Sequence, residues 1–336
     1  MRHLLSLVFP LMTFGFVASG PHHPAAALPG IALVAAVVFL DRRARAVSAP
    51  PADDRARAAW PFTALAVALA LVQLATLALL VRMIARHGWS WDLVIVGWFV
   101  GNNSGWGSLV VAHELIHRRA PLLRLLGRAL LCTVLYDHFF VEHLRGHHVR
   151  VATPDDPATA RFDESYNHFF VRTVPAQFRS AWRLGRRQVL AGLAVEAALV
   201  AAITVVAGWP GLVVFLWQAY GAITVLEAVN YFEHWGLVRR GARPGAEDAW
   251  DTDTWLTHYP LIGLSRHADH HAHAGRPFHA LRAVDESPKL PGGYYAMVAL
   301  AQMRNRTFRA RMTEELRRRR LGPFVVAVPV EGGHTR

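Results

Sequence analysis

The feature that most constrains this chain is a series of long segments with almost no charge. Four of them approach the roughly 20 consecutive apolar residues that a helix needs to cross a bilayer. Two shorter ones precede them between Arg2 and Asp41, an interval without formal charge that is interrupted by SGPHHP at residues 19–24. The six predicted spans cover residues 4–20, 25–40, 62–81, 93–112, 188–208 and 212–231, the last two joined by a Trp209-Pro210 turn.

Composition favours the same class of protein. The 336 residues are 53% hydrophobic and 18% charged, which is typical of an all-α polytopic membrane protein. The net charge is +12, but the arginines flank the apolar segments, which favours a membrane protein over a nucleic-acid binder. We therefore expect one integral-membrane domain over residues 1–336. The alternative for residues 1–20 is a signal peptide, because they begin with a basic residue and carry small residues near Ala18.

The arginines also predict an orientation. The 41–59 linker carries Arg42, Arg43, Arg45, Arg55 and Arg57, whereas the 85–91 turn has one arginine and the 209–211 turn has none. By the positive-inside rule the linker is cytoplasmic, and so are both termini, the 113–187 interval and everything after Tyr231. We expect a bacterial inner or plasma membrane protein whose polar regions face the cytoplasm.

Four histidine clusters fall on that side of the predicted membrane. They are HELIH, EHLRGHH, NYFEHWGL and RHADHH, and three of them repeat histidine at helical spacing, which places the rings on one face of a helix. Neutral imidazole is a common ligand of iron, zinc and copper. Nine such rings exceed what one metal can bind and suit two metals with four or five each. The predicted ligands are His113, His117, His143, His147, His148, His234, His267, His270 and His271.

Carboxylates adjoin these histidines and could orient the rings by accepting their second N–H. They are Glu114, Glu142, Glu233 and Asp269. The remaining histidines are interpreted as interfacial, surface or supporting residues: His3, His22, His23, His87, His138, His168, His258, His273, His279 and His334.

Two other classes of metal protein compete with this interpretation. HELIH fits the H-E-x-x-H signature of zinc proteases, in which the glutamate acts as a base. Such a site needs three protein ligands and an open position, so six further histidines would have no role. A metal transporter predicts acidic or histidine residues inside the spans, and only Glu196 and Glu227 qualify.

With these residues in view, the chain resembles the membrane-bound alkane 1-monooxygenases, which are non-haem di-iron hydroxylases related to xylene monooxygenase and the membrane fatty-acyl desaturases. The resemblance covers residues 113–295, about half of the chain, in the order of the family's motifs. The H-x-x-x-H-H spacing of His143–His148 is the hydroxylase form, whereas desaturases typically have H-x-x-H-H. The matching stretches are HELIHRR, HFFVEHLRGHHVRVATPDDPATAR, RTVPAQFRSAW, NYFEHWGLVR and LSRHADHHAHAGRPFHALRAVDESPKLPGGY.

The resemblance implies a six-span fold with a cytoplasm-facing di-iron site in the histidine-box regions 113–187 and 232–295. It implies that the nine histidines are the iron ligands, with no catalytic residue beyond them. It also implies electrons from a rubredoxin or ferredoxin and its NAD(P)H-dependent reductase. The chain departs from the family pattern at Ser265, where glutamine is usual, at Trp235, where tyrosine is usual, and in the acidic stretch AWDTDTW.

The predicted reaction is O₂-dependent hydroxylation of a terminal or near-terminal C–H of an alkane or alkyl chain. Iron supplies redox chemistry that zinc cannot, and the single cysteine, Cys132, excludes an iron–sulfur centre within the chain. An apolar substrate can partition into the bilayer and enter a channel shaped by Trp106, Leu109 and Val110, just before the first ligands. The alternatives are a fatty-acyl desaturase or hydroxylase and an aromatic-methyl monooxygenase, which differ in their products.

Overall fold

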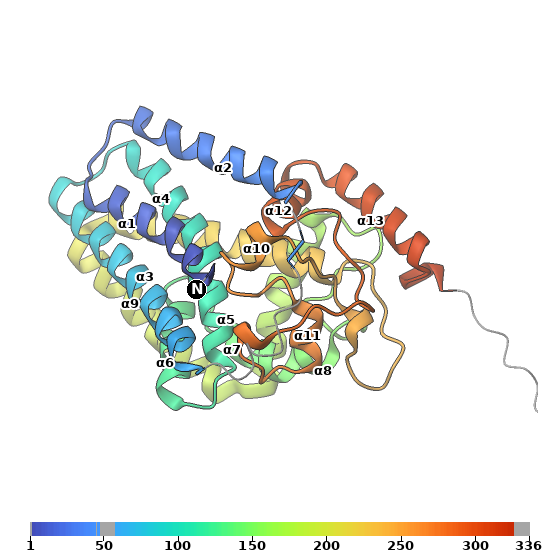
Figure 1. The fold of residues 1–336 in the computed structure, drawn as a ribbon. Coiled ribbons are helices and arrows are strands. Elements are labelled where there is room, and N and C mark those ends of the chain that lie inside the picture. Colours follow the sequence, from blue (N-terminus) through green and yellow to red (C-terminus); the bar gives the residue numbers. More distant parts are fainter. Residues whose placement is uncertain (1, 45, 48–57, 326–336) are drawn as a thin grey trace, which may run out of the picture.

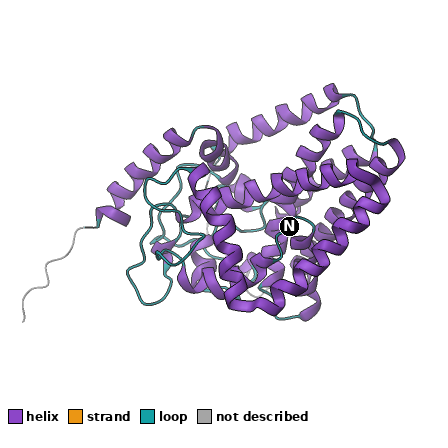
Figure 2. Ribbon diagram, turned by 180° about the vertical axis from the view of Figure 1, so that it is seen from behind, coloured by secondary structure: helices purple, strands orange, loops and turns teal. Residues whose placement is uncertain are grey.

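The computed structural model describes residues 2–44, 46–47 and 58–325. In this part of the chain every regular element is helical, and the only β pairings are two isolated bridges, so the prediction of an all-α fold is confirmed (Figures 1 and 2). Arg45, Arg55 and Arg57 of the predicted cytoplasmic linker, and His334, lie outside the described residues.

The N-terminal apolar segments form two short helices. A 3₁₀ turn, Arg2–Leu7, leads into α1, Val8–Ala18, which packs against α3 and α4. A second 3₁₀ turn, Pro24–Ala27, leads into α2, Leu28–Asp41, which packs against α12 near the C-terminal end of the fold (Figure 1).

A long helix and a composite helix follow. The α3 helix runs over Trp60–His87, and the chain turns at Gly88, whose φ of 69° is accessible to glycine without strain. The α4 helix, Asp92–Asn103, continues through a π-helical turn, Ser104–Leu109, into α5, Val110–Ile116. The predicted fourth span therefore leads directly to the first histidine cluster.

The α9 element, Tyr166–His234, contains the last two predicted spans. Its backbone leaves helical geometry at Gly185 and at Gly208, so it consists of separate helical sections. The break between the two predicted spans lies at Gly208, one residue before the predicted Trp209-Pro210 turn, because its φ of 63° requires a residue without a Cβ. Pro210 instead lies in the first turn of the next section, where its missing N–H costs nothing.

By length and composition, two helices of the described residues can cross a bilayer, α3 and α9. The apolar stretches at 2–18 and 25–41 are shorter. The predicted fourth span is divided among α4, the π-helical turn and α5. The membrane-type prediction is thus supported at this coarser level, and the count of six spans stays a prediction.

The α4 and α9 helices approach closely at two glycines. A Cβ at Gly101 would lie 2.7 Å from the Gln218 carbonyl oxygen, and one at Gly221 would lie 3.4 Å from the Gly101 Cα. Small residues permit this approach of helix backbones in a membrane-type bundle. The contact fixes α4, and the residues that follow it, against the second half of α9.

Shorter helices gather at one end of the long ones and build the site (Figure 1). They include a second π-helical turn between α7 and α8, and their side chains join the main hydrophobic core. The elements are α6 (Pro121–Cys132), α7 (His138–Glu142), the π-helical turn His143–His147, α8 (His148–Arg150), the 3₁₀ turn Ala246–Asp248, α10 (Trp255–His258), α11 (His267–Ala272), the 3₁₀ turn Phe278–Ala280, α12 (Tyr294–Met303), α13 (Asn305–Arg319) and the 3₁₀ turn Gly322–Phe324.

Candidate metal centre

All nine predicted histidines lie together, in two groups. Within each group, one ring nitrogen per residue lies within 4.8 Å of the corresponding atoms of the others. We call them the outer group and the inner group, because the inner one is completely buried whereas three members of the outer one are half-buried. The outer group comprises His113, His117, His143, His148 and His270, and the inner group comprises His147, His234, His267 and His271.

The ring nitrogens converge at distances that suit metal coordination. In the outer group, Nε2 of His143 lies 2.9 Å from Nε2 of His117 and 3.0 Å from Nε2 of His148. In the inner group, Nε2 of His267 lies 3.2 Å from Nε2 of His234 and 3.0 Å from Nε2 of His271. Two adjacent ligands at about 2.0–2.1 Å from one metal ion lie roughly 3 Å apart, so each group can surround one ion.

Two histidine clusters contribute to both groups. His143 and His148 join the outer group while His147, between them, joins the inner one. The third helical cluster divides likewise, with His270 in the outer group and His267 in the inner group. The two groups lie side by side, so one helix can contribute rings to both.

The π-helical turn His143–His147 makes this division possible. The His148 N–H bonds back to the His143 carbonyl, five residues earlier, in place of the usual four. The wider turn brings His143 and His148 one above the other, so both reach the outer group. His147 then projects to the side, where its ring lies 4.8 Å from that of His234 and 4.9 Å from that of His271.

Two ring nitrogens that face away from the inner group are held by oxygen acceptors. Nδ1 of His147 lies 2.9 Å from Oδ2 of Asp156, a buried carboxylate that also accepts a hydrogen bond from the Thr159 hydroxyl. Nδ1 of His234 lies 3.1 Å from the Asp248 carbonyl oxygen. Both contacts place the proton on Nδ1 and leave the Nε2 lone pair for a metal. Neither acceptor was predicted, because each reaches the ring through an irregular turn that leaves no regular spacing in the sequence.

Three of the four predicted orienting carboxylates act elsewhere. Glu114 pairs with Arg118 and accepts the Phe278 N–H, Glu142 accepts from Arg150, and Asp269 accepts from Arg276 and from the Arg282 backbone. The physical reason is helical geometry: an adjacent residue projects about 100° away, so its carboxylate cannot reach the outer edge of the neighbouring ring. These groups anchor the surrounding segments instead. Because Glu114 is paired with Arg118, it is not placed to act as the base of a zinc protease.

Glu233 does contact a ligand histidine, but on the other edge of the ring. Its Oε2 lies 3.2 Å from Nε2 of His267, the nitrogen that faces the inner group. Its Oε1 accepts a hydrogen bond of 2.7 Å from the Tyr294 hydroxyl. The expected contact with the neighbouring His234 is replaced by this one, and the carboxylate therefore stands beside the candidate metal position.

Burial keeps the converging rings neutral. It lowers the pKa of His143, His148 and His270 well below the usual range, and repulsion between neighbouring histidines lowers it further. The same causes lower the pKa of His267 and His271. Neutral imidazole is the form that binds metal ions. Nε2 of His113 and of His147 finds no hydrogen-bond partner among the described residues, which an ion at each group would supply.

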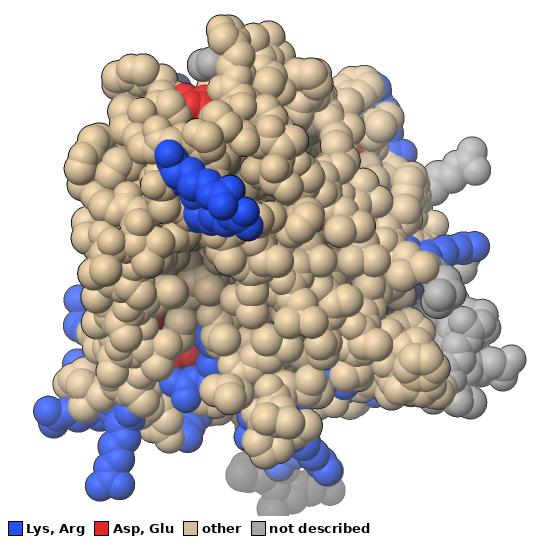
Figure 3. All heavy atoms as spheres, turned by 90° about the vertical axis from the view of Figure 1, so that its left-hand side faces the viewer, with Lys and Arg blue, Asp and Glu red and all other residues tan. Residues whose placement is uncertain are grey.

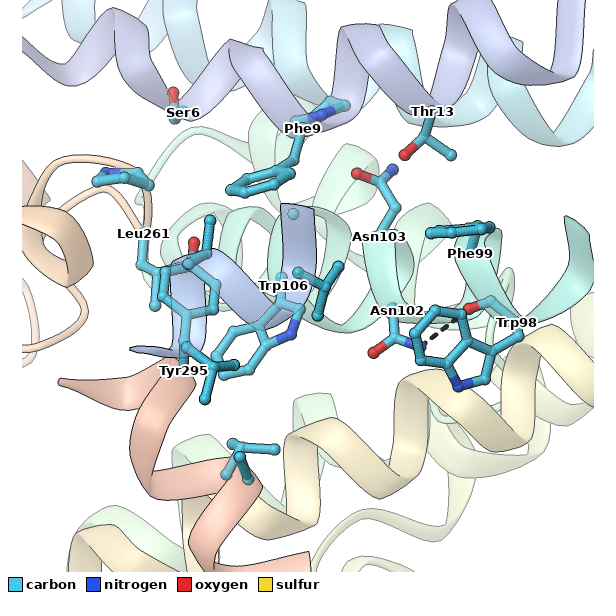
Figure 4. Close-up of a pocket in the computed structure, with 18 of the residues that line it drawn as sticks. Ser6, Phe9, Thr13, Trp98, Phe99, Asn102, Asn103, Trp106, Leu261 and Tyr295 are labelled. Atoms are coloured by element: carbon cyan, nitrogen blue, oxygen red, sulfur yellow. Dashed lines mark hydrogen bonds between the residues drawn. The ribbon is translucent and has the colours of Figure 1, made fainter. Parts of the chain in front are cut away.

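The predicted channel residues line two cavities. A small one of about 30 Å³ is lined by His113, His143, His267 and apolar side chains that include Leu109 and Val110. A larger one of about 210 Å³, which we call the large pocket, opens between α1, α2, α4 and α12 (Figure 4). Trp106 lines the large pocket, where its ring packs 4.6 Å from that of Tyr295. The predicted channel residues thus divide between the two cavities.

Fold and site together define a membrane-type helical protein that presents two clusters of neutral imidazoles. The model of the fatty acid desaturase family matches residues 58–301, well over half of the chain. The chain belongs to the fatty acid desaturase family.

Its curated relatives include alkane monooxygenases. Alkane 1-monooxygenase 2 of Pseudomonas aeruginosa is 38% identical over 260 residues, which cover 69% of this chain and 69% of the relative. Alkane 1-monooxygenase 1 of the same organism is 38% identical over 240 residues, 65% of this chain and 63% of the relative. The hydroxylase component of a xylene/toluene monooxygenase of Pseudomonas putida is 26% identical over 203 residues, 56% of this chain and 55% of the relative. The matches to the two alkane 1-monooxygenases thus span about two thirds of each protein.

The Asp156 contact leads to a prediction about metal retention. Asp156→Asn keeps the size of the side chain but removes the charge that favours the Nδ1–H form of His147, so we expect the inner group to bind its metal about 10–100-fold more weakly. Metal content of the purified protein during titration with a chelator measures this. Asp155→Asn, an exposed neighbour, is the matched control. Equal retention by both variants would remove Asp156 from the site.

Proposed function

We propose that this protein is an O₂-dependent hydroxylase that converts a terminal or near-terminal C–H of an alkane or alkyl chain into an alcohol at a di-iron centre. The observation that carries the proposal is the convergence of nine imidazoles into a five-membered and a four-membered group. The relatives' names, alkane 1-monooxygenase, supply the reaction class.

The donor set fits two iron ions. Each group offers nitrogen ligands only, and five in the outer group exceed the four of a closed tetrahedral zinc site. Imidazole also suits iron, and the family relationship favours non-haem iron. Bound iron supplies the activation of O₂ with two electrons, in the overall reaction R–H + O₂ + 2 e⁻ + 2 H⁺ → R–OH + H₂O. The protein side chains hold the rings, exclude water and place the alkyl chain.

The two cavities suggest an apolar route to the histidines. We propose that substrate enters the large pocket from the bilayer, passes Trp106 and reaches the small cavity beside His113, His143 and His267. Leu109 and Val110, which line the small cavity, would then form the end of the channel. Burial of the chain supplies most of the binding free energy, at about 0.8 kcal/mol per CH₂.

We further propose six membrane spans within a single domain, with the histidine groups at the cytoplasmic face of a bacterial inner membrane. One side of the molecule supports this, because it presents a broad surface of uncharged residues with basic side chains mainly at its edges (Figure 3). Large hydrophobic residues of the long helices α3 and α9, such as Leu71, Val205 and Val206, are exposed, as expected for contact with lipid.

The nearest alternatives stay within the same family. A fatty-acyl desaturase would give an alkene and an aromatic-methyl monooxygenase a benzylic alcohol, so product analysis separates them from a terminal hydroxylase. A metal transporter is disfavoured by the two acidic residues of the predicted spans. Glu196 accepts from the Asp137 N–H and Glu227 from the Tyr136 hydroxyl, and neither joins a metal group.

Isotope labelling tests the proposed reaction. Whole cells that express the protein and receive a medium-chain alkane under ¹⁸O₂ should form a terminal alcohol that carries the label, because one oxygen atom comes from O₂. Mass spectrometry of the product measures it. An alcohol labelled from H₂¹⁸O instead would contradict a monooxygenase.

We propose that the electron donor is a separate protein. The single cysteine, Cys132, is buried and has no cysteine partner, so we propose that a rubredoxin or ferredoxin with its reductase delivers electrons. His117 and His148 of the outer group are half-buried, which makes that group the nearer one to the surface. We propose that Arg145, Arg150 and Arg161 form the docking face, and Arg145 and Arg161 are exposed. Arg150 is half-buried and donates to Glu142 and Ser180.

This leads to a prediction about salt and charge. NAD(P)H alone should give no turnover, and added carrier and reductase should restore it. Because such carriers are usually acidic, rising salt should slow turnover by screening exposed charges beyond about 8–10 Å. Arg145→Gln should raise the carrier concentration needed for half-maximal rate, while Arg306→Gln, an exposed arginine on α13, should not. Salt-independent turnover at saturating alkane would argue against a charged docking face.

His234 is the ligand that sequence spacing supports least, because it stands alone in its cluster. We expect His234→Ala to lose one iron per chain, or to bind it weakly, since the inner group would fall from four imidazoles to three. Iron content and activity of the purified variant measure the effect. His168→Ala, at an exposed histidine outside both groups, is the control. Full iron occupancy with substantial activity would reduce the ligand count to eight.

A further inference from the structure

The wall of the large pocket contains an unused hydrogen-bond acceptor. Asn103 lines this pocket at the end of α4 and is 6% exposed. Its Oδ1 accepts no hydrogen bond from the described residues. Figure 4 shows the Asn103 side chain turned toward α1, beside Thr13. A buried polar atom without a partner is costly, so this oxygen calls for a donor that the described chain does not supply.

A chain of four hydrogen bonds fixes which atom of Asn103 is left over. Nδ2 of Asn103 donates to Gln73 at 2.7 Å, and Nε2 of Gln73 donates to the Ser104 hydroxyl at 2.7 Å. The Ser104 hydroxyl donates to Oε1 of Gln218 at 3.0 Å, and Nε2 of Gln218 donates to the Thr133 carbonyl at 2.8 Å.

The direction of this chain cannot be reversed, because the Thr133 carbonyl can only accept. Gln218 must therefore present its amide nitrogen to Thr133 and its oxygen to Ser104. The Ser104 hydroxyl then donates to Gln218 and accepts from the Gln73 amide nitrogen, so the Gln73 oxygen is left to accept from the Asn103 amide nitrogen. The Asn103 amide cannot flip without breaking the chain, so the atom facing the pocket is an acceptor and its partner must carry a donated hydrogen.

This oxygen is enclosed, but a space about the size of a methyl group adjoins it at Gly107. Gly107 also lines the large pocket, and a Cβ at this position would lie 3.6 Å from Oδ1 of Asn103 and 3.4 Å from Cγ of Pro10. The missing side chain of Gly107 therefore leaves room for one small group beside the acceptor. The rest of the lining is largely apolar and includes Phe9, Val37 and Val38.

We propose that the large pocket binds the hydroxyl end of a primary alcohol, which donates its O–H to Oδ1 of Asn103, so that the enzyme hydroxylates the far methyl end of alkan-1-ols. The inference rests on the proposed hydroxylase function. The balanced reaction is HO–R–CH₃ + O₂ + 2 e⁻ + 2 H⁺ → HO–R–CH₂OH + H₂O, an α,ω-diol, with the two electrons supplied by the external carrier.

The alternatives for the bound end fit less well. An n-alkane has no donor, and a carboxylate at neutral pH has only acceptors. An ammonium group has donors, but its desolvation in an apolar pocket that offers no carboxylate is costly. The geometry separates substrate from product: ten residues of continuous helix place Asn103 roughly 15 Å along the axis from His113. A hydroxyl newly formed at the metals is therefore at the wrong end of the chain to reach Asn103.

The experiment compares alkan-1-ols with n-alkanes of the same carbon number in the wild type and three variants. Asn103→Leu removes the acceptor. Gly107→Ala fills the gap and leaves the hydrogen-bond chain intact, so it serves if Asn103→Leu folds poorly. Asn167→Leu is the control, because Asn167 is an exposed asparagine of α9 that lies outside the large pocket and takes no part in the hydrogen-bond chain. Turnover is measured as diol and alcohol formed, and binding as the shift in Tm on addition of each ligand.

We expect the ratio of alkan-1-ol to alkane turnover to fall about fivefold in Asn103→Leu and in Gly107→Ala, the loss of one hydrogen bond, and to stay at the wild-type value in Asn167→Leu. The additional Tm shift given by the alcohol should disappear in the same two variants. A ratio and a Tm shift that neither variant changes would overturn the proposal and leave a bound water as the partner of Asn103. If no substrate is converted but the alcohol-specific Tm shift still depends on Asn103, the hydroxylase function fails and the alcohol site stands.

Discussion

The convergence of nine imidazole rings is the constraint that the rest of this structure serves. Neutral imidazoles each carry one donor and one acceptor nitrogen, and rings whose Nε2 atoms crowd within 4.8 Å cannot all satisfy one another. Burial also removes water from the inner group, where all four rings are enclosed. Such an arrangement is expensive unless ions accept the lone pairs. The surrounding helices, turns and ion pairs hold the nine rings so that their lone pairs point to two positions.

Local departures from regular helix do much of that work. The π-helical turn at His143–His147 lets one cluster supply both groups, and a second one at Ser104–Leu109 precedes His113. A π-helical turn adds a residue to the helix and therefore rotates everything after it. The hydrogen bonds of such a turn have poorer geometry than those of an α-helix, so the turn is stable only where contacts with surrounding residues favour it. Here the first is fixed by the histidines themselves and the second by the buried hydrogen bonds of Ser104 with Gln73 and Gln218.

The sequence was sufficient to identify the all-helical class and to select nine histidines that the structure brings together, because repeated histidines at helical spacing leave a local pattern. It was not sufficient for contacts that pass through irregular turns or that join distant segments. Asp156 reaches His147 through an irregular turn, and Glu233 reaches His267 instead of its neighbour His234. The break at Gly208 was misplaced by one residue because Pro210 is the stronger sequence signal, although glycine is the residue that positive φ requires. The acceptor at Asn103 depends on partners 30 and more positions away and has no local signature.

One continuous helical path links these features. From α4 through the π-helical turn to α5, the chain carries Asn103 at the large pocket, Ser104 in the buried hydrogen-bond chain, Leu109 at the small cavity and His113 at the outer group. A helix is rigid along its axis, so it can fix the distance between a hydroxyl held at one end of a substrate and the metals at the other. The hydrogen bonds that hold Ser104 also fix the orientation of the Asn103 amide, so that its oxygen is the atom that faces the pocket. The same few contacts therefore set both the register of the first metal ligands and the polarity that a ligand must match.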